Sequence, residues 1–294
     1  MLLKKFKNYL SLVKFSHTIF AMPFALIGFS LGAVRTDSHF NIYLLIKVVL
    51  CMVFARTAAM AFNRYIDRDI DLKNARTALR EIPSGVVTKS SAITLVILSS
   101  IAFIVTTYFI NTLCFYLSPI ALFIVLGYSL TKRFTWLCHL VLGLGLSLAP
   151  IGAYLSVTGK FSWVPLFFSF TVITWVSGFD IIYALQDEEF DRSLNLKSMP
   201  AAFGKKGALA ISIFLHLLSI GFVFLAGIYL PFGNIFWIGA ILFAGLVVYQ
   251  HLIVKPGDLS KVNLAFFTTN GIASIVFAIF VITDLVMRMP KSVL

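Results

Sequence analysis

The sequence predicts an all-α membrane protein whose nine transmembrane helices form one bundle. Of its 294 residues, 60% are hydrophobic and 12% are charged, and the mean hydropathy is +0.96. A soluble domain of this length could not bury that much apolar surface. The apolar runs are continuous and about 20 residues long, as a spanning helix requires, whereas a barrel strand would alternate in polarity over about ten residues. A separate soluble domain is therefore excluded, and residues 1–294 are predicted to form a single membrane domain.

The nine predicted spans follow one another with short connections. They cover residues 11–34, 42–62, 91–110, 113–131, 136–157, 163–186, 207–230, 234–254 and 262–287. No small-residue cleavage site follows the first apolar stretch, so we interpret it as a span and not as a removed signal peptide. The cysteines Cys51, Cys114 and Cys138 lie in apolar stretches without metal-ligand spacing. They predict neither a disulfide framework nor a metal site.

The distribution of Lys and Arg predicts the orientation of the bundle. The N-terminal end and the loops after spans 2, 4, 6 and 8 hold 18 of the 24 basic residues, whereas the opposite side holds 4. The positive-inside rule then places the N-terminus and these loops in the cytoplasm. The net charge of +12 is explained by this topology and by attraction to the lipid bilayer. It does not indicate nucleic-acid binding, and no protein partner is readable.

The acidic residues indicate where a site lies, because eight of the twelve are in two cytoplasmic loops. The first motif loop, 63–90, holds Asp67, Asp69, Asp71 and Glu81, and the second, 187–206, holds Asp187, Glu188, Glu189 and Asp191. Asp180 precedes the second group by two helical turns. Solvated loop helices with balanced charge are the alternative explanation. Solvation alone, however, does not select two loops on one side of a charge-poor protein.

The two groups share a four-residue spacing. Asn63, Asp67 and Asp71 lie on one face if span 2 continues as a helix, and Tyr183, Asp187 and Asp191 repeat the spacing at the end of span 6. The offset between the groups is 120 residues and four spans, which predicts a parallel four-helix pseudo-repeat. Two facing carboxylate pairs would bind Mg²⁺, which takes few carboxylates and leaves coordination positions for phosphate oxygens.

These residues resemble the UbiA superfamily of intramembrane aromatic prenyltransferases, from span 1 to about Gly204. The first motif of that family, NDxxDxxxD, is matched by Asn63, Asp67 and Asp71, and its second, DxxxD, by Asp187 and Asp191. Further elements match as well. They are Arg56 before the first motif, the RTxxR…PSG element as Arg76, Thr77, Arg80, Pro83, Ser84 and Gly85, the YxxxK element as Tyr128 and Lys132 followed by Arg133, and D-x-x-Y as Asp180 and Tyr183.

Two positions depart from the usual family pattern. Arg64 stands where the family most often has Asp, so the first motif lacks one possible metal ligand. Glu81 stands where Pro is common. With the KFSHTIF stretch of span 1, these departures resemble the bacterial 4-hydroxybenzoate prenyltransferase-like branch, which includes members of a menaquinone route.

The resemblance implies Mg²⁺-dependent transfer of a polyprenyl group from its diphosphate to a small aromatic acid. Metal binding falls to Asn63, Asp67, Asp71, Asp187 and Asp191, and diphosphate binding to Arg56, Arg76, Tyr128, Lys132, Arg133 and Lys197. Asp180 is a further catalytic candidate. It would orient the acceptor hydroxyl or take the ring proton, or else pair with Arg56. His17, Asp180 and Tyr183 are candidates for contact with the acceptor. The acceptor implied is 4-hydroxybenzoate, in ubiquinone-type biosynthesis, with 1,4-dihydroxy-6-naphthoate in menaquinone biosynthesis as the alternative.

Other classes fit the sequence less well. A secondary transporter with a parallel repeat would account for nine spans and for charges within them, but transporters place polar residues near the midplane and not at the cytoplasmic helix ends. A haem farnesyl or chlorin prenyl transferase would use the same motifs. A CDP-alcohol phosphotransferase also holds Mg²⁺ at the membrane surface, but on one long motif, and this chain divides its acids between two loops.

Overall fold

The computed structural model describes residues 11–12, 20–36 and 41–288, and in this part of the chain the regular structure is helical apart from an isolated β-bridge between Lys255 and Asp258. The α-helices are α2 (Met22–Arg35), α3 (Ile42–Asp71), α4 (Lys89–Tyr108), α5 (Thr112–Thr131), α6 (Cys138–Thr158), α7 (Val164–Ala184), α8 (Glu188–Ser193), α9 (Met199–Tyr229), α10 (Asn234–Ile253) and α11 (Asn270–Arg288). A 3₁₀ turn, η2 (Leu185–Asp187), follows α7, and a π-helical segment, η3 (Leu264–Thr269), precedes α11. The all-α prediction is confirmed.

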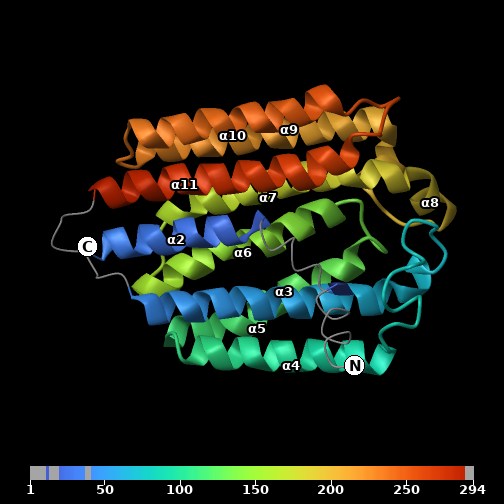
Figure 1. Ribbon diagram of the computed structural model, residues 1–294, viewed down its shortest axis with the longest axis horizontal. Coiled ribbons are helices and arrows are strands. Elements are labelled where there is room, and N and C mark those ends of the chain that lie inside the picture. Colours follow the sequence, from blue (N-terminus) through green and yellow to red (C-terminus); the bar gives the residue numbers. More distant parts are fainter. Residues whose placement is uncertain (1–10, 13–19, 37–40, 289–294) are drawn as a thin grey trace.

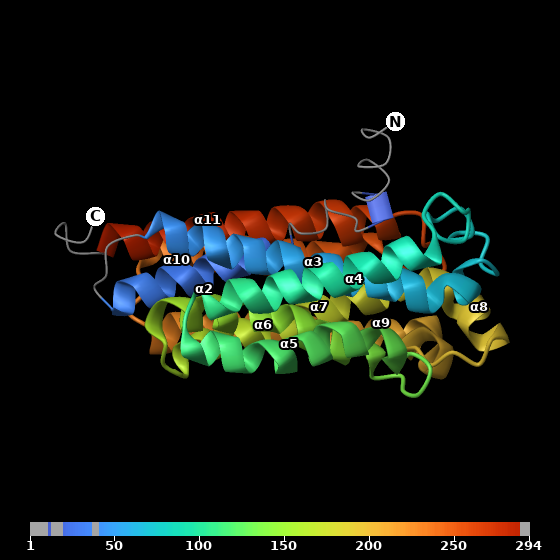
Figure 2. The same ribbon diagram turned by 90° about the horizontal axis from the view of Figure 1, so that it is seen from below.

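The long helices lie side by side along the longest axis of the molecule (Figure 1), and the view from below shows the same arrangement (Figure 2). Short helix α8 and the loop that follows α3 lie at one end, and α11 ends at the other (Figure 1). In the described residues, eight helical segments are long and apolar enough to cross a membrane, and α2 is a shorter apolar helix. The chain is therefore an integral membrane protein.

The first predicted span, 11–34, differs most from the structure. Helix α2 has 14 residues and carries a proline in its first turn, where a residue without a backbone N–H is tolerated. Pro23, predicted to lie inside a span, therefore marks where this helix begins. Residues 13–19 lie outside the described part of the chain, and with them His17.

Two predicted boundaries shift because a helix can continue after it leaves the apolar layer. Helix α3 extends to Asp71 and not to 62, so most of the first motif is helical. Helix α9 begins at Met199 and not at 207. Its N-cap is Ser198, whose side chain accepts the Ala201 N–H, and the helix is interrupted at Gly204, whose φ of 69° suits glycine. Helix α7 ends at Ala184.

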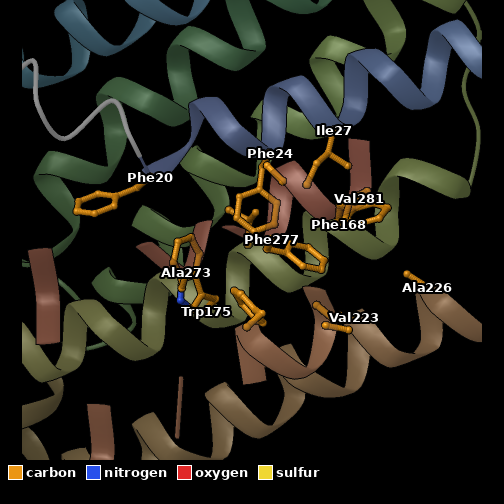
Figure 3. Packing of buried hydrophobic residues seen from close by; sticks show 14 of the residues in the cluster. Phe20, Phe24, Ile27, Phe168, Trp175, Val223, Ala226, Ala273, Phe277 and Val281 are labelled. Atoms are coloured by element: carbon orange, nitrogen blue, oxygen red, sulfur yellow. The ribbon is translucent and has the colours of Figure 1, made fainter. Parts of the chain in front are cut away.

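The core of the bundle is aromatic and fixes α7 in place. Phe24 of α2, Trp175 of α7 and Phe277 of α11 are fully buried in one cluster (Figure 3). The Phe24 ring centroid lies 5.5 Å from that of Trp175 and 6.0 Å from that of Phe277, both at tilted angles, a favourable arrangement for aromatic pairs. The Trp175 indole N–H also donates to the Asn270 side chain at 3.1 Å. The helix that leads into the second motif is thus held by α2 and α11.

Helix pairing follows the register of the predicted repeat. Helix α3 packs on α4, and α7, its counterpart four spans later, packs on α9. Helices α6 and α7 approach closely at Gly143, where a Cβ would lie 2.5 Å from the Ile173 carbonyl oxygen and from the Ser177 hydroxyl. This close contact places the first turn of α6 beside the last turns of α7. The pseudo-two-fold itself stays a prediction.

Candidate active site

The first motif lies on the last two turns of α3, and its carboxylates are buried. The Asn63 side-chain amide donates to Asp67 Oδ2 at 3.2 Å, as expected for residues four apart on one helix face. Asp67, 3% exposed, also accepts from Lys132 Nζ at 2.7 Å and from Arg133 Nη2 at 2.9 Å. Both cations follow α5, so the structure places the end of the YxxxK element beside the first motif.

Asp71 ends α3 and organises the loop after it. The Thr77 hydroxyl donates to the Asp71 carbonyl at 3.0 Å, and Arg80 Nη1 donates to Asp71 Oδ1 at 2.7 Å. Asp71 Oδ2 is buried and has no hydrogen-bond partner among the described residues. A buried carboxylate oxygen without a donor is costly, and a cation bound there would remove that cost.

The second motif has a different backbone. The helix is interrupted after Ala184 by the 3₁₀ turn and restarts as α8, so Tyr183, Asp187 and Asp191 do not share one continuous α-helix. The Gln186 side chain donates to the Tyr183 carbonyl at 3.1 Å, which satisfies a group left open by the interruption. Asp187 has a non-helical backbone, with φ −107° and ψ 7°.

Asp187 is held by the loop of the first motif. Arg76 binds it bidentately, with Nε donating to Oδ1 at 3.1 Å and Nη2 pairing with Oδ2, and the Asn74 amide donates to Oδ1 at 3.0 Å. Arg76 Nη1 also donates to the Tyr183 hydroxyl at 2.7 Å. Burial opposes the charge of Arg76, but Asp187 and Tyr183 outweigh it and raise the pKa of Arg76. Arg76 therefore joins the two motifs directly.

Asp191 and Lys197 are placed less tightly. Asp191 lies near the Ser198 hydroxyl and within range of the charges of Asp187 and Lys132. The Lys197 side chain is exposed. Its backbone N–H donates a 2.7 Å hydrogen bond to the Lys132 carbonyl. The structure thus fixes the Lys197 backbone beside Lys132 and leaves its ammonium group exposed.

Three polar side chains lie deeper between α3 and α5. Arg64 is 4% exposed, Arg56 and Tyr128 are half-buried, and both arginines lie close enough to Tyr128 for their charges to interact with it. The Nε atoms of Arg56 and Arg64 are buried without a hydrogen-bond partner in the described part of the chain. Cations in a membrane span mark functional positions by default.

Asp180 pairs with a residue that the sequence did not single out. Its Oδ2 lies 2.7 Å from His139 Nδ1, and no ion pair between Asp180 and Arg56 is found among the described residues. The sequence interpretation that Asp180 pairs with Arg56 is therefore wrong. Tyr183 stacks on Phe266, with ring centroids 4.2 Å apart.

Reasoning from sequence missed His139 and Asn74 as site residues, and it named Arg80 in the RTxxR element without assigning it a role. His139 is 41 residues from Asp180, and no local spacing joins them. Asn74 and Arg80 flank Arg76 in a polar loop. The sequence therefore indicated that they lie near Arg76, but it did not indicate which residues they contact.

The carboxylates fit a magnesium ion shared with phosphate, and not a cage built by protein alone. In the described residues no group of three or more His, Cys, Asp or Glu side chains is arranged to hold a metal. Instead, each motif offers a carboxylate pair beside Lys and Arg. Mg²⁺ characteristically uses one or two carboxylates together with substrate phosphates, and the open Asp71 Oδ2 provides one such oxygen.

Comparison with known proteins gives one consistent family. Residues 21–272 match the model of the UbiA prenyltransferase family. A 4-hydroxybenzoate octaprenyltransferase of Francisella tularensis subsp. mediasiatica is 30% identical over 242 residues, which cover 82% of this chain and 85% of the relative. The same enzyme of Vibrio campbellii is 29% identical over 232 residues, or 79% and 81% of the two chains.

Solved structures agree in fold. A UbiA homologue from Aeropyrum pernix K1, in its apo form, has a TM-score of 0.79 and 30% identity, and the match covers 93% of this chain and 98% of that one. A UbiA homologue from Archaeoglobus fulgidus, bound to DMAPP and Mg²⁺, has a TM-score of 0.75 and 20% identity, with 95% and 99% covered. The second match supports the fold alone.

Proposed function

The chain belongs to the UbiA prenyltransferase family, and from that premise we propose that it transfers a polyprenyl group from polyprenyl diphosphate to 4-hydroxybenzoate in ubiquinone-type quinone biosynthesis. The observation that carries this proposal is the Arg76–Asp187 ion pair, because it makes the two carboxylate motifs one site. The secondary transporter that nine spans left open is not retained, because the family is one of enzymes.

Each motif residue has a role in holding the donor diphosphate. Asn63, Asp67, Asp71, Asp187 and Asp191 are the proposed ligands of Mg²⁺, directly or through water. Cations already placed beside these carboxylates bind the diphosphate oxygens: Arg76, Lys132 and Arg133 at the surface of the site, and Arg56 with Tyr128 deeper in it. Lys197 contributes through its exposed ammonium group.

The reaction exchanges one bond for another. The allylic C–O bond breaks and the diphosphate leaves with the electron pair, the ring carbon of the acceptor bonds to the allylic carbon, and the ring loses a proton, for which Asp180 is the proposed acceptor. Mg²⁺, when bound, neutralises the charge that grows on the departing diphosphate. The arginines and Lys132 act in the same direction from fixed positions. The packed aromatic core below the site excludes water that would trap the allylic cation.

The acceptor is the least determined part of the proposal. The name of the relatives at 30% identity supports 4-hydroxybenzoate. Arg64 and Glu81 resemble the 4-hydroxybenzoate prenyltransferase-like branch, which includes members of a menaquinone route, so 1,4-dihydroxy-6-naphthoate is the alternative acceptor, with the same site and mechanism. Asp180 and Tyr183 are proposed to contact either acceptor, and His17 is a further candidate from the sequence.

We propose that the site faces the cytoplasm from a bacterial inner membrane. The N-terminal end, and the loops after α3, α5, α7 and α10 with the helix ends that adjoin them, contain 18 of the 24 basic residues, and the positive-inside rule puts these segments in the cytoplasm. Soluble aromatic acids would then reach the site from the aqueous side, while the polyprenyl tail remains among the helices and lipid.

Product analysis by mass spectrometry tests the function. The membrane-embedded protein is incubated with geranyl diphosphate, Mg²⁺ and either 4-hydroxybenzoate or 1,4-dihydroxy-6-naphthoate. We expect prenylated benzoate; prenylated naphthoate instead would keep the mechanism and change the pathway. Absence of product with both acceptors, in protein that retains its fold, would contradict the proposed function.

A further inference from the structure

The pair formed by His139 and Asp180 is the best-defined polar contact in the membrane that the motifs do not explain. His139 lies in the first turn of α6 and its side chain is 5% exposed, whereas the Asp180 side chain on α7 is 23% exposed. The close approach of α6 and α7 at Gly143, one turn further along α6, brings the two residues together.

The second ring nitrogen of His139 determines the direction of this hydrogen bond. The Met199 backbone N–H donates to His139 Nε2 at 3.3 Å. A backbone N–H can only donate, so Nε2 carries a lone pair and the ring proton is on Nδ1. His139 Nδ1 therefore donates to Asp180 Oδ2. The Ser177 hydroxyl donates to the His139 carbonyl at 3.1 Å and links the same two helices.

One oxygen of Asp180 remains for another donor. The hydrogen bond from His139 takes Oδ2 and fixes the plane of the carboxyl group, and the structure gives Oδ1 no protein donor among the described residues. Asp180 precedes Asp187 by seven residues, or about 10 Å at the rise of a helix, so it lies below the motif carboxylates on the side of the apolar core. His139 is itself within charge range of Asp191.

We propose that His139 is a positioning residue that holds Asp180 so that Oδ1 accepts a hydrogen bond from the hydroxyl of the aromatic acceptor. This inference rests on the proposed function and narrows its substrate class to aromatic acids with a free ring hydroxyl. A ring hydroxyl that donates a hydrogen bond to a carboxylate releases more electron density into the ring. The ring carbon that bonds to the allylic group therefore becomes more nucleophilic. Fixing the carboxyl plane also fixes which ring carbon faces the donor.

A purely structural role for His139 would act through its other contact, with the first N–H of α9. Two substitutions separate these contacts, because Asn and Gln place their amides at the δ and ε positions of the side chain respectively. His139→Asn keeps a donor near Nδ1 for Asp180 and loses the acceptor for Met199. His139→Gln keeps an acceptor for Met199 and loses the donor to Asp180.

The test compares both variants with the wild type, using whichever hydroxy acid the wild type prenylates and the methyl ether of that acid as a competitive inhibitor. We expect His139→Gln to raise the acceptor KM about tenfold, the value of one hydrogen bond, to leave the KM for geranyl diphosphate unchanged, and to lose the preference for the hydroxyl over the ether. His139→Asn should keep the acceptor KM within about threefold. His216→Gln, a buried histidine of α9 outside the site, controls for the loss of a buried imidazole.

Three outcomes would overturn the inference. If His139→Gln behaves like the wild type while His139→Asn is impaired, the role is structural. If both variants raise the KM for the acceptor and for the diphosphate equally, positioning of Asp180 is excluded. If the wild type prenylates no acceptor at all, the proposed function fails and this inference with it, whereas an active wild type with an unaffected Gln variant contradicts the inference alone.

Discussion

The two carboxylate motifs share a four-residue spacing, but the backbones that carry them differ. The first lies on a continuous helix, and the side chain of its Asp67 is 4% exposed and paired with two cations from the end of α5. The second lies on an interrupted helix, and the side chain of its Asp187 is 17% exposed and held by Arg76 from the loop of the first motif. The same spacing thus produces one buried, rigid carboxylate group and one that depends on its partner.

This difference predicts separate effects on folding and on activity. A buried carboxylate that neutralises two cations contributes to stability as well as to chemistry, because its removal leaves charges without a counter-ion. A partly exposed carboxylate contributes less to stability. The following predictions test that contrast, from the largest expected effect on activity to the smallest.

Asp67→Asn and Asp187→Asn should each lower kcat/KM by about 10³-fold, since each removes a carboxylate from the diphosphate site. Thermal unfolding in detergent should separate them. Asp67→Asn lowers Tm because Lys132 and Arg133 lose their counter-ion, whereas Asp187→Asn changes it little. Equal losses of Tm would show that the two motifs are not structurally different.

Arg76→Lys should lower kcat/KM by about 10- to 100-fold through a higher KM for geranyl diphosphate, because a lysine cannot reproduce the bidentate contact with Asp187. Arg192→Lys is the matched control, since the exposed Arg192 pairs with Glu188 of the same short helix at 3.0 Å. If the Arg76 variant had the wild-type KM for geranyl diphosphate, the ion pair between Arg76 and Asp187 would not be needed for diphosphate binding.

Arg64→Asp should lower the Mg²⁺ concentration that gives half-maximal activity several-fold. Arg64 is a buried cation within charge range of Asp71 and Glu81, and a cation there repels a divalent ion. Titration with Mn²⁺ followed by electron paramagnetic resonance measures the same change without turnover. Arg68→Asp on the same helix is the control, and an unchanged titration at position 64 would refute the prediction.

Asp284→Asn should leave kcat and KM within about twofold and lower Tm, because surface and structural carboxylates outside a site act on stability alone. Asp284 is 3% exposed, accepts the Gly233 N–H at 2.8 Å at the start of α10 and pairs with Arg288 at 3.2 Å. It lies at the end of the bundle opposite the motifs. A large loss of activity in this variant would mean that carboxylates affect catalysis through the fold alone.

The sequence was most informative about features that depend on residues close together in the chain. Apolar run length predicted six of the nine spans within two residues at each end. The spacing of Asn63, Asp67 and Asp71 predicted one helical face, which the helix to Asp71 confirms. The same reasoning was misleading at Asp187, because the spacing does not reveal the interruption after Ala184. Periodicity describes an ideal helix, and the hydrogen bonds from Arg76 and Asn74 that hold Asp187 come from residues more than 100 positions away.

The pairing of His139 with Asp180 was beyond the sequence for a related reason. Their contact depends on how closely α6 and α7 approach, and that distance is set by Gly143 against the Ile173 carbonyl. A small residue in an apolar span predicts close packing in general, but not which polar pair it brings together. Long-range polar contacts therefore had to come from the structure.

The central claim is that both motifs form one diphosphate site joined through Arg76. Isothermal titration of a non-hydrolysable geranyl diphosphate analogue, with and without Mg²⁺, tests it on the wild type, Asp67→Asn, Asp187→Asn and the double variant. We expect Mg²⁺-dependent binding that each single substitution weakens nearly as much as both together. Losses of binding free energy that simply add, or binding that is unaffected by either substitution, would contradict a single site.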